Sequence, residues 1–176
     1  LAAVGRPGGY DVQIAAPEAG PVPSDTLMSI EATVALRDLG VPDTVMIAGA
    51  ARIEEALERE AALVDWCRTS GPKVPRCAAL CTGSFFLAEA GLLDGKRAAT
   101  HWNYADRLRQ RFPQVEVDAD AIFLRAGQIW TSAGVTAAID LTLAFVEQDC
   151  GRDIALAVAR DMVMYLKRPG GQSQFS

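Results

Sequence analysis

One cysteine is the residue of this chain best placed for nucleophilic chemistry. Cys81 follows the short apolar segment Arg76 to Leu80 and precedes Thr82-Gly83-Ser84 and a helical pattern over residues 85–90. A strand that turns through small residues into a helix is the geometry of a nucleophile elbow, which lifts one side chain out of a sheet. Because the start of a helix favours a thiolate over a thiol, we expect an exposed, partly ionised thiol at Cys81.

The only histidine of the chain, His101, directly follows a second strand pattern, Ala98-Ala99-Thr100. An imidazole near a cysteine can take its proton or orient it, so Cys81 and His101 are the candidate catalytic residues. No position is assigned to a third, acidic member. The alternatives stay open: Cys81 as a small buried hydrophobic residue, and His101 as a structural histidine at a strand end.

Four further residues are candidates for ligand binding. The N–H groups of Thr82 and Gly83 would receive an oxyanion or carboxylate, although the tight turn alone also requires small residues. Gly49 follows another strand pattern and offers a further amide. Trp102, like Tyr104, is a candidate pocket wall, and ordinary packing at a helix start explains either aromatic residue equally well.

Composition limits the possible functions. With 176 residues, half of them apolar and 22% charged, the chain fits one globular domain. Its net charge of −5 argues against this segment binding a phosphate backbone by itself. The four cysteines form no CxxC pair and no cluster with the histidine, so we expect no metal, no cofactor and a reduced cytoplasmic protein. Apolar stretches fall short of the roughly 20 residues of a membrane span, and no leader opens the chain.

Strand and helix patterns alternate along the chain. Strands are predicted at 10–16, 43–49, 76–80, 98–100, 116–117, 121–125 and 129–131, a turn at 20–23, a short hairpin at 26–32, and helices at 53–68, 85–90, 103–112, 137–148 and 153–166. The last helix is expected to face inward with Ile154, Ala157, Val158, Met162 and Tyr165. This alternation predicts an α/β fold with a mostly parallel sheet covered on both faces. Ligands then bind beyond the carboxyl ends of the strands, where Cys81 and His101 both fall.

Several separated motifs resemble the ThiJ/PfpI branch of the class I glutamine-amidotransferase-like superfamily. They are Ala79-Leu80-Cys81-Thr82-Gly83, the stretch AGLLDGKRAATHW at 90–102 and the stretch TSAGVTAAIDL at 131–141. The resemblance implies a flavodoxin-like three-layer sandwich. The segment 159–176 is similar to the part of AraC-family transcription regulators that joins such a domain to a C-terminal helix-turn-helix pair.

This resemblance implies a division of the chain. Residues 1–167 would be a ligand-sensing and dimerisation domain, and residues 168–176 the start of a linker toward a helix-turn-helix domain outside this chain. The implied partners are a small-molecule effector and a second copy in a homodimer, with DNA bound only through the separate domain and no membrane.

Two departures from the family pattern bear on activity. The family's first strand carries an acidic residue beside the cysteine, whereas this chain opens on Leu1-Ala2-Ala3-Val4-Gly5, which resembles the end of the helix that follows that strand. The sheet should therefore lack an inner strand. In addition, Asn103 stands where glutamine amidotransferases have a glutamate, which disfavours glutaminase chemistry.

Two functions remain after these observations. The first is the effector-sensing domain of an AraC-family regulator, with little or no turnover. The second is a cysteine-dependent enzyme, since the Cys-Thr-Gly elbow and the Ala-Thr-His-Trp motif are also similar to isocyanide hydratases, with a glyoxalase or amidase variant on the same residues. In the hydratase, the thiolate would attack an electrophilic carbon and water would release an N-formyl product.

Overall fold

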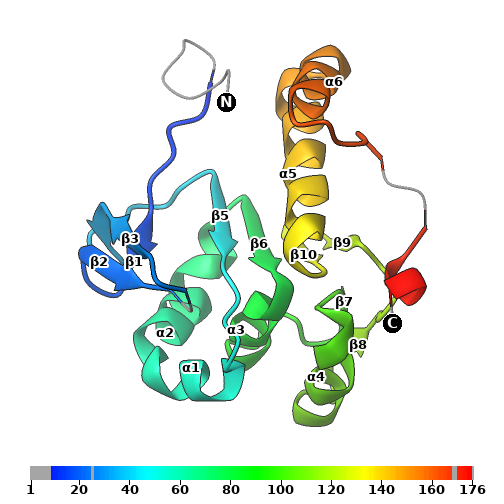
Figure 1. The fold of residues 1–176 in the computed structure, drawn as a ribbon. Helices are drawn as coiled ribbons and strands as arrows, with labels where there is room; N and C mark the ends of the chain where they lie inside the picture. Colours follow the sequence, from blue (N-terminus) through cyan, green and yellow to red (C-terminus); the bar gives the residue numbers. More distant parts are fainter. Residues whose placement is uncertain (1–8, 25, 168–169, 176) are drawn as a thin grey trace.

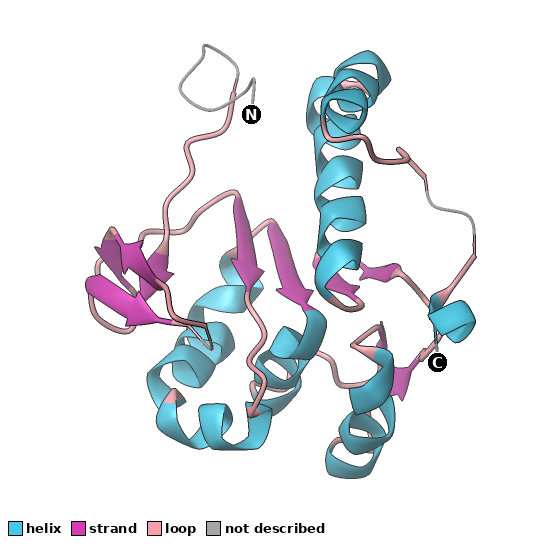
Figure 2. Cartoon of the chain, viewed as in Figure 1, coloured by secondary structure: helices cyan, strands magenta, loops and turns pink. Residues whose placement is uncertain are grey.

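The chain has an α/β fold built on a mostly parallel sheet (Figures 1 and 2). The computed structural model describes residues 9–24, 26–167 and 170–175. The main sheet has the order β5 (Thr44–Ile47), β6 (Arg76–Leu80), β10 (Ile129–Ser132) and β9 (Phe123–Ala126). The first three strands are parallel and β9 is antiparallel to β10. The predicted strands at 43–49, 76–80, 121–125 and 129–131 are thus confirmed.

Three smaller two-stranded sheets flank the main one. They are β1 (Ala15–Ala16) with β4 (Val34–Ala35), the antiparallel hairpin β2 (Gly20–Pro23) and β3 (Ser29–Ala32), and β7 (Arg97–Ala98) with β8 (Glu116–Val117). The predicted turn at 20–23 is therefore wrong, because these residues form the first arm of the hairpin. Its prolines fit there because β2 is an edge strand.

The N-terminal strand is shorter than the sequence predicts. Of residues 10–16 only Ala15–Ala16 form a strand, and Val12 is 65% exposed. Strand structure requires a paired neighbour, and β1 pairs with β4 alone among the described residues. In the main sheet, β5 pairs only with β6 among the described residues. The strand β5 is therefore one edge of that sheet. Residues 1–5, expected to end a helix, lie outside the described residues, and so do residues 168, 169 and 176 of the predicted linker start at 168–176.

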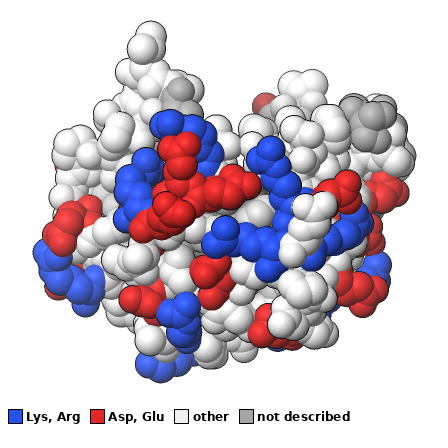
Figure 3. All heavy atoms as spheres, turned by 90° about the horizontal axis from the view of Figure 1, so that it is seen from below, with Lys and Arg blue, Asp and Glu red and all other residues white. Residues whose placement is uncertain are grey.

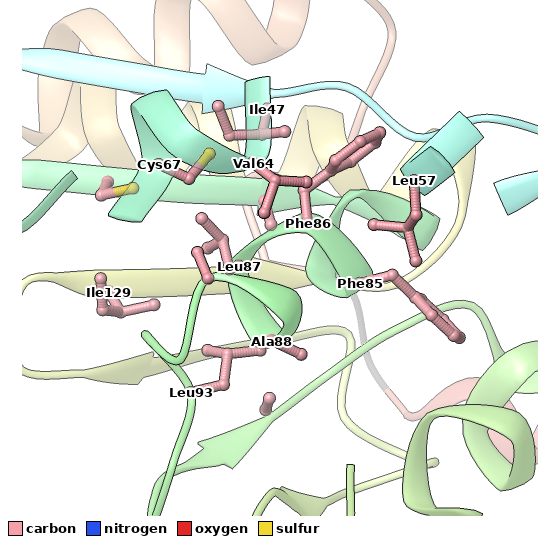
Figure 4. Packing of buried hydrophobic residues seen from close by; sticks show 14 of the residues in the cluster. Ile47, Leu57, Val64, Cys67, Phe85, Phe86, Leu87, Ala88, Leu93 and Ile129 are labelled. Atoms are coloured by element: carbon pink, nitrogen blue, oxygen red, sulfur yellow. The ribbon is translucent and has the colours of Figure 1, made fainter. Parts of the chain in front are cut away.

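One face of the sheet is covered by α1 (Ile53–Arg59), α2 (Ala61–Ser70) and α3 (Ser84–Glu89). Figure 4 shows the core between them, with Val64 of α2 and Phe86 and Leu87 of α3 beside Ile47 and Ile129 of the sheet. The single helix predicted at 53–68 is divided in two at Glu60, which has φ −102° and ψ 40°. A short 3-10 turn, η1 (Gly71–Lys73), then leads into β6.

The opposite face of the sheet is covered by α5 (Val135–Cys150). Ala78 of β6 and Trp130 of β10 pack there against Leu141 and Phe145. Their neighbours Cys77 and Ala79 point into the first core, as strand alternation requires. Helices on both faces make the flavodoxin-like three-layer sandwich that the sequence predicts.

The helix after α5 differs from its prediction. It is α6 (Arg152–Asp161), which packs on α5 and stops well before residue 166. Ala155 and Ala159 are its buried residues, whereas Ile154, Met162 and Tyr165 are exposed. Small alanine side chains let the two helices approach closely, and this contact sets which face of α6 is buried.

Three further elements, which follow β7 in the sequence, complete the described chain. The 3-10 turn η3 (Trp102–Tyr104) leads into α4 (Ala105–Arg111), in place of the single helix predicted at 103–112. After α6 the chain returns to the domain as η4 (Gln172–Phe175), which lies near β8 and β9 in Figure 1. No helix among the described residues is long and apolar enough to cross a membrane.

Candidate functional site

The backbone bends sharply where β6 meets the next helix. Cys81 opens the 3-10 turn η2 (Cys81–Gly83), and α3 begins at Ser84. Cys81 has φ +55°, a left-handed conformation that costs a residue with a side chain roughly 1–3 kcal/mol. The bend leaves Cys81 half-buried at the carboxyl end of the strand, while Ala79 before it and Thr82 after it are buried. This is the elbow geometry.

Buried hydroxyl groups hold this strained peptide in place. Thr100 Oγ1 donates to the Cys81 carbonyl oxygen at 3.1 Å. Ser84 Oγ lies 3.2 Å from the same oxygen and 2.9 Å from Thr100 Oγ1. Both hydroxyl-bearing residues are fully buried, so their bonds do not compete with water. The residue before His101 is thereby fastened to the elbow.

The loop after β5 closes over the other side of the elbow. Thr82 Oγ1 donates to the Ala50 carbonyl at 2.8 Å and accepts from the Ala50 N–H at 2.9 Å. A Cβ at Gly49 would lie 2.5 Å from Thr82 Oγ1, and a Cβ at Gly83 would collide with the Ile47 carbonyl oxygen. Both glycines are needed because the two backbones approach so closely.

An open pocket of about 390 Å³ lies between these loops and the start of α5. Its lining residues come from the β5 loop, the elbow, η3 and the first turn of α5; they are Gly49, Ala50, Ala51, Cys81, Thr82, Tyr104 and Val135. Gly49 and Thr82, both predicted to bind a ligand, are therefore in the wall. Gly83 and Trp102 are not. Gly83 is buried at the end of the turn. Trp102 is 41% exposed, and its ring centroid lies 5.6 Å from the ring centroid of His101.

Three of the lining residues carry no chemical signal in the sequence. Ala50, Ala51 and Val135 have apolar side chains, and Val135 reaches the pocket only because α5 begins beside the elbow. Tyr104 is fixed by its hydroxyl, which donates to the Ala51 carbonyl at 2.8 Å, and by edge contacts with Phe85 and His101. The pocket is thus mostly apolar, and Cys81 is one of its lining residues.

His101 lies at the neighbouring strand end. Its Nδ1 accepts the Asn103 N–H at 3.2 Å, so the neutral ring carries its proton on Nε2. The ring rests against Gly134, where a Cβ would lie 2.6 Å from Cδ2. Within the described part of the chain, no hydrogen bond joins the Cys81 thiol to the imidazole. The connection between them runs through Thr100, which precedes His101 and bonds to the Cys81 carbonyl.

The electrostatics of the thiol differ from the sequence prediction. Burial raises the pKa of Cys81, and hydrogen bonding to Thr82 acts against the rise. The direction of this shift is opposite to the lowered pKa expected for an exposed, partly ionised thiol at Cys81. The helix after the elbow spans only six residues, Ser84–Glu89, and burial is the largest cause of the shift at Cys81. In comparison, burial raises the pKa of both Cys67 and Cys77 to about 12.

Among the described residues, no group of three or more His, Cys, Asp or Glu side chains could hold a metal ion. The four cysteines are free.

The fold agrees with the comparison to known proteins. The model of the DJ-1/PfpI family matches residues 1–148, and the chain belongs to this family. A crystal structure of a ThiJ/PfpI family protein from Pseudomonas syringae is similar with a TM-score of 0.77 and 25% identity, over 92% of this chain and 65% of that one.

Two curated relatives represent two functions. The HTH-type transcriptional regulator CdhR of Pseudomonas aeruginosa is 34% identical over 160 residues, covering 91% of this chain and 47% of the regulator. The isonitrile hydratase of Pseudomonas putida is 34% identical over 139 residues, covering 78% of this chain and 59% of the hydratase. The chain thus spans about half the length of the curated relatives it matches.

Proposed function

We propose that this chain is the effector-sensing and dimerisation domain of an AraC-type transcription regulator, with the domain ending near residue 167 and DNA bound by a separate C-terminal domain. The effector is a small molecule that enters the pocket above Cys81. The observation that carries the proposal is the site itself: a mostly apolar pocket beside a strained elbow, whose thiol has a pKa raised by burial and has no hydrogen bond to the imidazole among the described residues. Such a site suits binding better than turnover. The similarity to CdhR over 91% of the chain supports this assignment.

The test is a thermal-shift screen of a small-metabolite library with the intact protein. A true effector must stabilise the folded state in proportion to its binding. Val135→Trp fills the pocket mouth at little structural cost, because Val135 is exposed at the start of α5. We expect a hit to raise the Tm of the wild type and not of Val135→Trp. The matched control is Ile154→Trp on exposed α6, which should keep the response. A hit that stabilises all three proteins equally binds elsewhere.

The charge distribution supports a division of labour with a separate DNA-binding domain. Figure 3 shows Lys and Arg side chains interspersed with Asp and Glu on the face it presents. The arginines of α4 are paired: Arg109 with Asp106 at 2.7 Å, Arg111 with Glu89 at 3.0 Å and Arg107 with Glu54 at 3.4 Å. We therefore predict that this chain alone does not retard duplex DNA at physiological salt in a gel-shift assay. Tight, sequence-selective retardation would contradict the division.

A cysteine-dependent hydratase is the second candidate, favoured by the similarity to the isonitrile hydratase. In such a reaction the Cys81 sulfur would add to the isonitrile carbon, which takes up a proton. Water would then add to that carbon, and the C–S bond would break to release an N-substituted formamide and the thiol. Incubation with an alkyl isonitrile, followed by detection of the formamide, tests it. Product formation that disappears in Cys81→Ala would establish the enzyme, whereas equal background in both proteins supports the sensor.

A further inference from the structure

The end of the described chain is anchored by one buried glutamine. Gln172 is 4% exposed, although it follows a polar, glycine-rich stretch. Its Nε2 donates to the carbonyls of Thr100 and Ala121, both at 3.0 Å, and its Oε1 accepts the Trp102 N–H at 2.9 Å. Its own N–H donates to the Asp120 carbonyl at 2.8 Å. Both donors and the acceptor of the side-chain amide are therefore used.

Asp120 supplies a second attachment for the same segment. The Ser173 N–H donates to Asp120 Oδ1 at 2.7 Å. A Cβ at Gly171 would collide with the Asp120 carboxylate, so the glycine leaves room for this contact. Residues 170–173, hereafter the strap, are thus held along the loop that leads to β9.

The strap is attached on both sides of the candidate histidine. Thr100 and Trp102, two of the three residues bonded to the Gln172 side-chain amide, directly precede and follow His101. Thr100 also donates its hydroxyl to the Cys81 carbonyl at 3.1 Å. Hydrogen bonds of Thr100 therefore connect the elbow to Gln172. His101 lies between Thr100 and Trp102, the two loop residues that Gln172 binds on either side of it.

An amide is the side chain that this position requires. Thr100 and Ala121 lie outside the strands, so no ladder pairs their carbonyls. A glutamate at 172 would keep the acceptor for Trp102 and lose both donors. Because the bonds are buried, a change in the His101 loop alters their geometry directly, and release of the amide alters the loop in turn.

We propose that the strap passes the state of the Cys81 pocket to the chain beyond it, with Gln172 as the positioning residue of the His101 loop. This inference rests on the proposed function, in which the pocket takes an effector. An occupant that displaces the Cys81 carbonyl or Thr100 loosens the bonds of Gln172, and the segment after Ser173 is released. Conversely, a loosened strap changes the reactivity of Cys81.

The first experiment uses iodoacetamide as the pocket probe on the intact protein carrying Cys150→Ser, so that Cys81 is the accessible thiol. Alkylation forms a C–S bond, and iodide leaves. Hydrogen exchange of the peptide containing residues 170–175 is then measured by mass spectrometry. We expect exchange to be several-fold faster after alkylation, with no change in the peptide containing Gly71 and Pro72. Unchanged exchange in the strap would overturn the proposal.

The reciprocal experiment uses variants of the strap. Gln172→Glu should change the alkylation rate of Cys81 at least about threefold and shift the imidazole resonances, which belong to a single residue. Gln128→Glu is the matched control, because Gln128 Nε2 donates to two carbonyls, of Gly71 and Pro72, away from the pocket. Asp120→Ala removes an exposed attachment and should give a smaller change in the same direction, even if Gln172→Glu does not fold. If Asp120→Ala and any folded Gln172→Glu protein match Gln128→Glu in both the alkylation rate of Cys81 and the imidazole resonances, the strap and the pocket are not coupled.

The two proposals fail in different ways. An effector that stabilises the wild type without changing exchange in the strap would remove the coupling and leave the sensor. If no metabolite binds through the pocket, but iodoacetamide still loosens the strap, the sensor assignment falls and the coupling remains.

Discussion

Two residues with side chains adopt left-handed backbone conformations in the described chain, and they lie in opposite surroundings. Cys81 has φ +55° at the end of a buried strand, and Val163 has φ +54° just after α6. The Val163 side chain is 91% exposed, whereas Cys81 is half-buried between two loops. Similar local strain therefore occurs once in the candidate site and once on the surface.

The hydrogen bonds that hold the two bends also differ. At α6, the Val163 N–H donates to the Arg160 carbonyl at 3.0 Å and the Met164 N–H to the Ala159 carbonyl at 2.8 Å. This is the Schellman end of a helix, at which glycine is the usual residue. At the elbow, the buried hydroxyls of Thr100 and Ser84 hold the Cys81 carbonyl. The strain at Val163 only ends a helix, while the strain at Cys81 aims a thiol into a pocket.

The largest expected effect is that of a Cβ beneath the elbow. Gly83→Ala should lower the free energy of unfolding by about 3 kcal/mol, since the new methyl group collides with the Ile47 backbone, which cannot move freely. Urea denaturation measures the loss. Gly40→Ala, with open space around its Cα and no left-handed φ, should stay within about 0.5 kcal/mol. Similar losses in both variants would contradict the close packing of β5 on the elbow.

Loss of the hydroxyl that supports Cys81 should have an intermediate effect. Thr100→Val removes one of the two buried hydroxyls that hold the Cys81 carbonyl, and it takes the Thr100 partner from Ser84, so we expect about 1.5 kcal/mol of destabilisation. Thr142→Val, which removes an exposed hydroxyl bonded within α5, is the control and should be nearly neutral. Thermal or urea unfolding distinguishes them. A neutral Thr100→Val would mean that the bend at Cys81 needs no such support.

The smallest effect, of opposite sign, is expected at the surface bend. Val163→Gly should stabilise the protein by about 1 kcal/mol, because glycine adopts the left-handed conformation without strain. Val163→Ala keeps a Cβ and should give a smaller gain. If Val163→Gly destabilises the chain in urea, the helix end is held by contacts of the valine side chain, and the two bends are more alike than described above.

The elbow could be predicted from the sequence because its signals are local. Small residues at 82–84 between an apolar strand and a helix define the turn, and strand alternation then sets which side of the sheet each residue of β6 faces. Glycines at 49 and 83 fit the same reasoning, since close backbone approach needs them. The predicted strands of the main sheet were confirmed for the same reason, since their apolar patterns are also local.

The remaining features depend on distant parts of the chain. The buried face of α6 is set by its contact with α5, and the short β1 by the strand available to pair with it. Trp102 lies outside the pocket wall, and its N–H is bonded to Gln172, a contact far along the sequence. The pKa of Cys81 follows from burial in three dimensions, which no motif specifies.

The most direct test of the account is the rate of Cys81 alkylation by iodoacetamide across pH 7–9, mapped by peptide mass spectrometry on the native protein. Because burial raises the pKa of Cys81, its thiolate is scarce at neutral pH, and the rate should climb about tenfold per pH unit without levelling near pH 7. At each pH, Cys81 should react about tenfold or more faster than Cys67 and Cys77, whose pKa is raised to about 12 by deeper burial. Equal labelling of these three thiols would contradict the account, because Cys81 would then not be the thiol that the elbow presents to the pocket.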